Sequence, residues 1–244
     1  MSLSIIIPTL NEEFALPSTL ANVATLDPAP LEIIIADAGS TDRTVMIARD
    51  AGVRVIDNLS AGRAAQMNAG AQAGTGDLLC FLHADTIVPP DFVSCVEEVL
   101  QDRKTALAGF VSIMRGQKGV RRVTTAHNFI KTWYAPALFR PISFIRGTRL
   151  LFGDQVMVCR REDFEAIGGW DEAQAIMEEA DLCLRMVRAG RGRVRQVPRK
   201  VWSLDRRVAE WGFWRANLTY LYIGLMWGFG AEPKRLAHRY EDVR

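Results

Sequence analysis

Short apolar runs alternate with amphipathic segments along the first hundred residues of the chain. The runs are bounded by proline, aspartate or turn residues, and they cover residues 4–8, 31–36, 53–56 and 78–86. Runs of this length are typical of buried strands. Helical patterns between them begin around Thr9 or Asn11, at Ser40 or Thr41, and at Gly62. The alternation with short connections predicts an α/β fold built on a doubly wound, mostly parallel sheet flanked by helices.

The regular alternation of apolar runs and amphipathic segments ends after Asp91. The expected elements are then a helix over 92–100, strands over 106–114 and 156–159, a helix over 177–189 and a strand over 193–197. The tail from Val208 to Gly230 is rich in Trp, Phe, Tyr and Leu. Its uninterrupted apolar part is about fourteen residues, short of the roughly twenty that span a bilayer. We expect a helix that covers the core or lies in a membrane interface.

An aspartate lies at the carboxyl end of two of the predicted strands. Asp37 follows the run 31–36, and Asp85 ends the run 78–86. Ligands of open α/β sheets bind beyond the carboxyl ends of the strands, so both side chains are expected at the mouth of a pocket. There they could hold a nucleotide and a hard divalent cation that bridges its diphosphate. The alternatives are that Asp37 only forms a turn and that Asp85 only caps the helix near Asp91.

A third acidic cluster opens the helix predicted at Met177. Glu178, Asp181 and Arg185 are spaced i, i+3 and i+7 and therefore share one face, whereas Glu179 is expected roughly 100° away around the helix axis. A carboxylate near a helix N-terminus is held ionised and can act as a general base. The alternative is that these acids only complement the helix dipole.

Composition narrows the class of protein further. The 244 residues are 49% hydrophobic with a formal charge of +2, which is typical of a globular domain. The four cysteines are widely spaced, without a metal-site pattern, and we expect them to be buried apolar residues. The N-terminus enters a strand directly, without the features of a signal peptide, which predicts a cytoplasmic location.

Charge is unevenly distributed in the middle of the chain. No acidic residue occurs between Asp102 and Asp154. The ten basic residues of this interval are Arg103, Lys104, Arg115, Lys118, Arg121, Arg122, Lys131, Arg140, Arg146 and Arg149. Aromatic residues are interleaved with them, so the interval is either a solvated face or a surface for an anionic partner, such as acidic lipid or a phosphate-bearing substrate. Nucleic acid is disfavoured, because no binding motif accompanies the charge.

Several segments together resemble glycosyltransferase family 2, whose members have the GT-A fold. The segments are 5–12 (IIIPTLNE), 36–44 (ADAGSTDRT), 62–70 (GRAAQMNAG), 82–86 (LHADT), 168–170 (GGW) and 177–181 (MEEAD). They follow the family order over residues 3 to about 190, and the set is specific although each piece is weak. Residues 153–155 and 203–207 resemble a bacterial branch of small members.

The resemblance implies a role for each matching residue. The nucleotide-binding set is Pro8, Thr9, Glu12, Asp37, Arg63, Ala84, Asp85 and Arg206. In this set Asp37 accepts from the base, usually uracil, Arg63 lies near the diphosphate and Arg206 steadies the departing diphosphate. Asp85 and His83 are the expected ligands of Mn or Mg. The expected catalytic pair is Glu179, as the base, with Glu178 beside it, and the acceptor-side set is Asp154, Gln155, Gly169 and Trp170.

Two residues depart from the family pattern. His83 stands where the family has the first carboxylate of its DxD motif, so the metal site has lost one anionic ligand. Imidazole still binds divalent metals, with a shift in preference toward Mn. Glu179 replaces an aspartate and lengthens the reach of the base by one methylene. These departures keep open an alternative in which the chain is a non-catalytic nucleotide-sugar-binding or membrane-docking relative.

The expected function is an inverting, metal-assisted transfer of a sugar from a UDP-sugar to an acceptor hydroxyl, with an acceptor that is lipid-linked or anionic. A nucleotidyltransferase is a weaker alternative, because no Gly-rich loop follows the first strand; a dehydrogenase is disfavoured on the same ground. We expect one domain over 1–200, with a nucleotide-sugar half over about 1–105 and an acceptor half over 106–200. A helical extension over 201–244 is expected to pack on it. Peripheral contact with the inner face of a membrane fits the basic interval.

Overall fold

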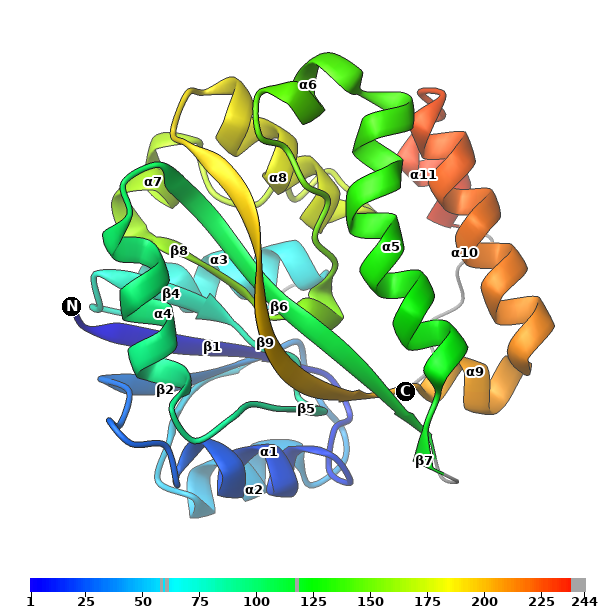
Figure 1. Ribbon diagram of the computed structural model, residues 1–244. Helices are drawn as coiled ribbons and strands as arrows, with labels where there is room; N and C mark the ends of the chain where they lie inside the picture. The colour runs from blue at the N-terminus through cyan, green and yellow to red at the C-terminus, as the bar shows by residue number, and fades with distance from the viewer. Residues whose placement is uncertain (58, 60–61, 117–118, 238–244) are drawn as a thin grey trace.

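The strands of one mixed β-sheet are distributed along most of the chain (Figure 1). The computed structural model describes residues 1–244 except 58, 60–61, 117–118 and 238–244, so Lys118 of the basic interval lies outside the described residues. The strands are β1 (Leu3–Thr9), β2 (Glu32–Asp37), β3 (Arg54–Ile56), β4 (Leu78–Phe81), β5 (Thr86–Ile87), β6 (Thr105–Gly116), β7 (Gly119–Val120), β8 (Met157–Arg160) and β9 (Arg193–Leu204).

Helices flank the sheet on both faces and continue past its last strand. They are α1 (Leu16–Val23), α2 (Thr44–Asp50), α3 (Arg63–Ala73), α4 (Phe92–Gln101), α5 (Arg122–Phe139), α6 (Pro141–Ile145), α7 (Arg161–Ala166), α8 (Glu178–Arg188), α9 (Arg206–Trp211), α10 (Phe213–Gly228) and α11 (Pro233–Ala237), with a 3₁₀ turn, η1, over Gly153–Gln155. The expected α/β fold with a helical C-terminal extension is confirmed.

The strand order joins the two halves of the chain. It is β3-β2-β1-β4-β8-β6-β9-β5, with β7 paired to β6. The first four strands are parallel to one another, as the strand–helix alternation predicts. β8 then inserts antiparallel between β4 and β6. β8 therefore joins the strands before residue 105 to those after it in one continuous sheet. The boundary between the two halves of the domain, expected near residue 105, stays a prediction.

The sheet has a hydrophobic core on each face, and successive side chains of β1 point into one core and then the other. Ile5 and Ile7 point to the face covered by α1, α2 and α4, whereas Ile6 points to the face covered by α3, α7 and α8. A strand buried on both faces reads as a continuous apolar run, which is why the sequence pattern identified it. The four cysteines are buried and free, also as expected.

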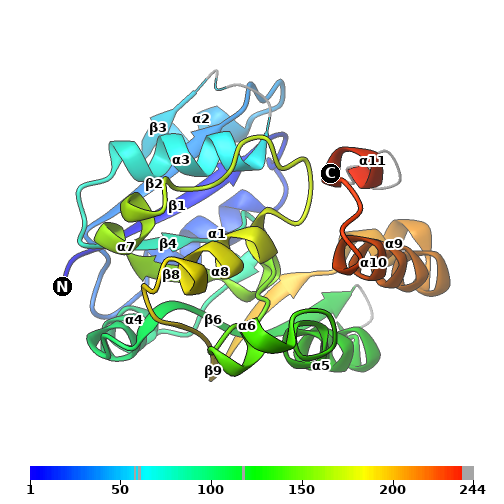
Figure 2. The same ribbon diagram turned by 90° about the horizontal axis from the view of Figure 1, so that it is seen from above.

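The C-terminal helices stand beside α5, away from the main body of the sheet (Figures 1 and 2). They meet the domain through a small apolar cluster of their own, formed by Ile176, Ile223 and Leu236. None of the helices in the described ranges combines the length and apolar character that a membrane crossing requires.

Two local expectations were wrong. The strand expected to end at Asp85 stops at Phe81, and the next residues form a turn in which the amide of Thr86 donates to the carbonyl of His83 at 3.2 Å. The first helix begins at Leu16 rather than near Thr9, because Thr9 still belongs to β1 and Asn11 adopts a positive φ of 57°. Both errors arise where polar residues build loops at the carboxyl edge of the sheet.

Candidate active site

A cavity of about 960 Å³ opens at the carboxyl ends of β1 and β4. Residues from almost every part of the chain line it. The sequence-predicted residues among them are Pro8, Thr9, Glu12, Arg63, His83, Ala84, Asp85, Asp154, Glu178, Glu179 and Arg206. The crevice therefore lies where ligands bind in open α/β sheets.

The loops after β1 and β2 are tied to each other beside the cavity. The amide of Asn11 donates to Ser40 Oγ at 2.8 Å, and the amide of Glu12 donates to Thr44 Oγ1 at 2.7 Å. From α3, Gln66 Nε2 donates to the carbonyl of Thr9, which ends β1, and to that of Ala36, one residue before the end of β2, at 2.7 Å each. These bonds hold the loop that carries Glu12 in one place on the cavity wall.

Asp37 organises these loops from within. It is fully buried, and its oxygens accept from Thr9 Oγ1 at 2.9 Å, from the amides of Gly39 and Ser40, and from Ser40 Oγ. It does not line the cavity. The structure thus places Asp37 in the turn-forming role that was its alternative, and its contact with a nucleotide base stays a prediction.

Asp85 lies on the cavity wall in an ion-paired cluster. Arg206 binds Glu12 through both terminal nitrogens, at 3.1 and 2.6 Å, and its Nη2 also lies 3.1 Å from Asp85 Oδ2. Burial raises the pKa of Asp85 above its ordinary value, the Arg206 guanidinium opposes that rise, and Asp154 adds to it. Asp85 does not cap α4, whose N-cap is Asp91.

Strand pairing explains how Arg206 reaches Asp85 across 120 residues. β5 pairs antiparallel with the end of β9, with Thr86 opposite Ser203. The two hydroxyls are 2.7 Å apart, and Ser203 Oγ also donates to the carbonyl of Asp154 at 3.2 Å. The register therefore places the residue before Thr86 beside the residues that follow β9.

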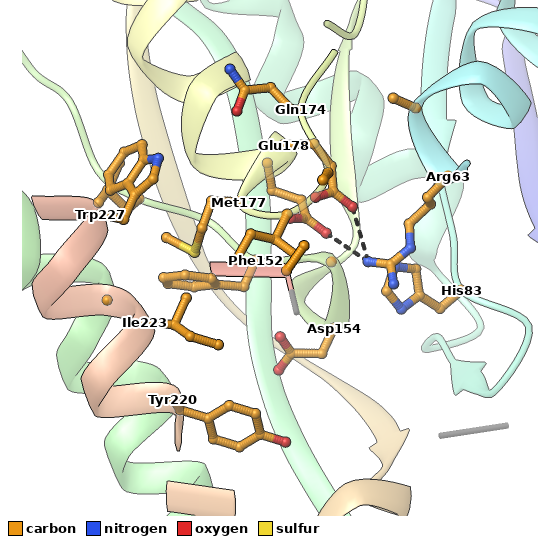
Figure 3. A pocket seen from close by; sticks show the side chains of 18 of the residues that line it. Arg63, His83, Phe152, Asp154, Gln174, Met177, Glu178, Tyr220, Ile223 and Trp227 are labelled. Carbon is orange, nitrogen blue, oxygen red and sulfur yellow. Dashed lines mark hydrogen bonds and ion pairs between the residues drawn. The ribbon is translucent and has the colours of Figure 1, made fainter. Parts of the chain in front are cut away.

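A second ion-paired cluster lines the same cavity. Arg63 Nη1, at the start of α3, lies 3.2 Å from Glu178 Oε1 and 3.2 Å from Glu179 Oε1 (Figure 3). Both glutamates are 7% exposed. The expectation that Glu179 points away from Glu178 was wrong, because the long side chains at the first turn of α8 converge on one guanidinium.

The other acid of this turn has a structural role. Asp181 binds Arg185 at 2.6 Å, as the spacing predicted, and Arg185 Nη1 donates to the carbonyls of Ile167 and Gly169. Trp170, 2% exposed, packs edge-on against Phe81. Neither Gly169 nor Trp170 lines the cavity, so the structure does not bring these two acceptor-side candidates to the site.

The η1 turn places Gly153 between His83 and the second cluster. A Cβ on Gly153 would lie 2.3 Å from the His83 ring and 2.7 Å from Glu179 Oε1, so a side chain at this position would displace one of these two groups. Asp154 lines the cavity and accepts from Asn128 Nδ2. Gln155 is fully buried instead and binds Thr132 of α5 at 3.0 Å, which makes it a support for the turn.

The residues present fit a divalent cation held together with a substrate. No group of three or more His, Cys, Asp or Glu side chains suited to a metal occurs in the part of the chain that is described. Asp85 and His83 do both line the cavity. One or two protein ligands completed by phosphate oxygens and water are the usual coordination of Mg²⁺ in nucleotide sites. The donor set therefore suits a cation that arrives with a diphosphate.

Sequence reasoning missed most of the far wall of the cavity. Phe152 and Met177, which directly precede η1 and α8, line it together with Tyr220, Ile223 and Trp227 of α10 (Figure 3). The sequence signal for the three residues of α10 was an apolar tail, which is equally typical of a core helix. Lys131 of α5 also lines it, 3.8 Å above the Phe152 ring. Burial lowers the pKa of Lys131 below its ordinary value, against the attraction of Asp154 and Glu179.

The structure is that of an α/β protein with a charged cavity at the carboxyl ends of its parallel strands. Residues 4–168 match the profile of glycosyl transferase family 2, and the chain belongs to this family. It is 29% identical over 249 residues to the succinoglycan biosynthesis protein ExoA of Rhizobium meliloti, covering 96% of this chain and 70% of that protein. It is 26% identical over 218 residues to the pre-mycofactocin glycosyltransferase of Mycobacterium tuberculosis, covering 87% of this chain and only 43% of that relative.

Solved structures confirm the GT-A fold. A mannosyltransferase from Pyrobaculum calidifontis, in complex with GDP-Man and Mn²⁺, superposes with a TM-score of 0.71 at 20% identity, covering 98% of this chain and 68% of that one. Glucosyl-3-phosphoglycerate synthase from Mycobacterium tuberculosis, in complex with Mn²⁺, UDP and phosphoglyceric acid, superposes with a TM-score of 0.63 at 22% identity, covering 94% and 79%. The same synthase has also been solved with Mg²⁺ and UDP.

The pairing of Arg206 with Asp85 predicts competition between this guanidinium and a divalent cation. In Arg206→Gln, Mn²⁺ without nucleotide should raise the melting temperature several-fold more than in the wild type at pH 8, because the cation no longer displaces a bound charge. The control is the double variant Arg206→Gln/Asp85→Asn, which should lose the response. Equal Mn²⁺ shifts in Arg206→Gln and the wild type would contradict the competition.

Proposed function

We propose that this chain is an inverting glycosyltransferase that moves a sugar from a nucleotide-diphosphate sugar, UDP-linked, to an acceptor hydroxyl. The observation that carries the proposal is the pairing of two charged clusters in one cavity. One joins Arg206 to Asp85 and Glu12, and the other joins Arg63 to Glu178 and Glu179. The first suits a departing diphosphate, and the second suits an attacking hydroxyl.

At the donor end, the residues offset the negative charge that leaves with the nucleotide. Asp85 and His83 would hold Mn or Mg together with the diphosphate oxygens. A divalent cation bound there supplies charge stabilisation to the diphosphate. Arg206, already held by Glu12, supplies a fixed positive group on the same wall. Preorganised charge of this kind stabilises the transition state without the cost of reorienting solvent.

At the acceptor end, a glutamate accepts the proton of the attacking hydroxyl. The acceptor oxygen bonds to the anomeric carbon from the face opposite the diphosphate, and the bond from that carbon to the phosphate oxygen breaks. The proton passes to Glu179, with Glu178 beside it. Arg63 orients both carboxylates, since one nitrogen contacts each of them at 3.2 Å. A base must lie within hydrogen-bond reach of the proton that it accepts, and in this proposal Glu179 meets that requirement.

We predict that UDP is the nucleotide of the donor. UDP is expected to raise the melting temperature of the wild type in the presence of Mn²⁺ or Mg²⁺, because a ligand of the folded state stabilises it by mass action. The shift should disappear in Asp85→Ala. UDP is favoured by the family resemblance, whereas the two solved relatives bind GDP-Man and UDP respectively. GDP, ADP and CDP are the comparisons, and a larger shift with GDP would overturn the UDP assignment.

We also predict that Glu178 and Glu179 differ in their contribution to the reaction rate. Glu179→Gln should lower the rate of sugar transfer, and of slow donor hydrolysis, by about 10²–10⁴-fold, the usual contribution of a general base. Glu178→Gln should cost less, and both should still bind nucleotide with metal. The measurement is release of nucleoside diphosphate under saturating donor. If Glu178→Gln is the more impaired variant, the base is Glu178; unchanged rates in both would argue for a non-catalytic relative.

We also propose that the protein contacts an anionic membrane surface. Exposed apolar side chains occur along α5, α6 and α10, among them Ile142, Ile145 and Trp214, which are 68%, 83% and 75% exposed. Exposed Arg122 and Arg146 lie on α5 and directly after α6, in the interval that lacks acidic residues. Apolar side chains mixed with basic ones suit the interface of an acidic bilayer.

The membrane proposal predicts binding to vesicles that contain phosphatidylserine. The double variant Ile142→Glu/Ile145→Glu should bind such vesicles at least tenfold more weakly in co-sedimentation, because it places carboxylates against acidic lipid. Phe14→Glu is the matched control, since Phe14 is 89% exposed but lies beside α1. Equal loss in the control, or no wild-type binding at low salt, would contradict the proposal.

A further inference from the structure

The cavity has two chemically different ends. One end carries the charged groups of both clusters, among them Arg63, Glu178 and Asp85. The other end carries the large apolar side chains of Met177, Ile223 and their neighbours Phe152 and Trp227 (Figure 3). The two ends belong to one continuous space of about 960 Å³, which is near the upper limit for single-ligand pockets. The space is large enough for two reactants.

One face of α10 builds much of the apolar end. Tyr220, Ile223, Gly224 and Trp227 line the cavity and are spaced i, i+3, i+4 and i+7, so they share one face of the helix. Arg140, which lies between α5 and α6, holds this helix in place, because its Nη1 donates to the carbonyl of Gly228 at 2.9 Å. The apolar wall is therefore a built part of the site.

The reactants can be assigned to the two ends by their chemistry. A nucleotide, a diphosphate and a sugar are rich in polar groups, and burying such groups against apolar side chains is costly. The donor therefore belongs with the charged clusters. The apolar end is continuous with Glu178 and Glu179, so its occupant is in reach of the base. The remaining reactant is the acceptor.

We propose that the apolar end is the binding site for the hydrophobic body of the acceptor. The acceptor is then an amphipathic alcohol, in which the reacting hydroxyl ends an aliphatic or aromatic chain that lies between α5, α8 and α10. This inference rests on the proposed glycosyl transfer and deepens it by naming the substrate class. Binding of such a body removes apolar surface from water on both partners, which is its driving force.

Gly224 offers a way to close this space without disturbing the fold. A Cβ built on Gly224 meets no atom within 4 Å, although the residue lines the cavity. Gly224→Leu therefore fills the apolar end, and replacing a glycine inside a helix favours the helix. Thr219→Leu is the matched control, because Thr219 lies on the same helix, is partly exposed and does not line the cavity.

Binding is tested first with N-phenyl-1-naphthylamine, a neutral apolar probe whose fluorescence rises in apolar sites. The wild type and Thr219→Leu should bind it with equal affinity, and Gly224→Leu should bind it at least tenfold more weakly. Nucleotide-dependent thermal shifts should be the same in all three proteins, which shows that the donor end is intact. Equal probe affinity in the wild type and Gly224→Leu would overturn the proposal.

Transfer is tested with primary n-alkanols of increasing chain length, each below its solubility limit, because their hydroxyl ends the alkyl chain. The kcat/KM for the wild type should rise at least tenfold from butanol to octanol, and Gly224→Leu should lose this rise while keeping donor hydrolysis. A rate independent of chain length would overturn the acceptor assignment while leaving glycosyl transfer intact. Absence of donor hydrolysis in every protein would instead overturn the proposed function, and the probe titration would still decide whether the apolar site exists.

Discussion

The contact of Arg206 with Glu12 and Asp85 is the constraint on which the site depends. Three segments far apart in the sequence meet there: the loop after β1, the turn before β5 and the start of α9. Two partly buried carboxylates without a cationic partner would cost several kcal/mol in a protein interior. The Arg206 guanidinium is the cationic partner that stabilises both carboxylates when no substrate is bound. It also links the C-terminal helices to the donor end, so the wall that α10 adds is tied to the same charge cluster.

Polarity divides the cavity in a way that matches a two-substrate reaction. Both charged clusters line this space, and Gly153 of η1 lies between His83 and Glu179. The apolar wall lies beyond the glutamates. A reactant that enters from that side reaches the base with its polar end first. The geometry thus supports a transfer in which donor and acceptor approach from opposite ends, and this order follows from the chemistry of the walls.

The parallel half of the sheet could be predicted because its information is local. Ile5, Ile6 and Ile7 form a short apolar run, which is typical of a strand buried on both faces. The site was predictable in part, since a carboxyl strand end and a helix N-terminus favour charged groups. Other features are non-local. The turn at Asp85 depends on pairing between β5 and β9, and the apolar wall depends on where α10 packs. Trp170 and Gln155 matched family positions yet lie buried as supports, because sequence does not reveal which side of a loop faces solvent.

In the proposed reaction Asp85 marks the donor site. A crystal structure with Mn²⁺ and a nucleoside diphosphate, with the cation located by anomalous diffraction, tests this assignment. We predict one strong anomalous peak within bonding distance of Asp85 and of diphosphate oxygens, with Arg206 in contact with the diphosphate. A peak elsewhere, or a nucleotide bound with Arg206 still closed on an Asp85 that contacts no metal, would contradict it.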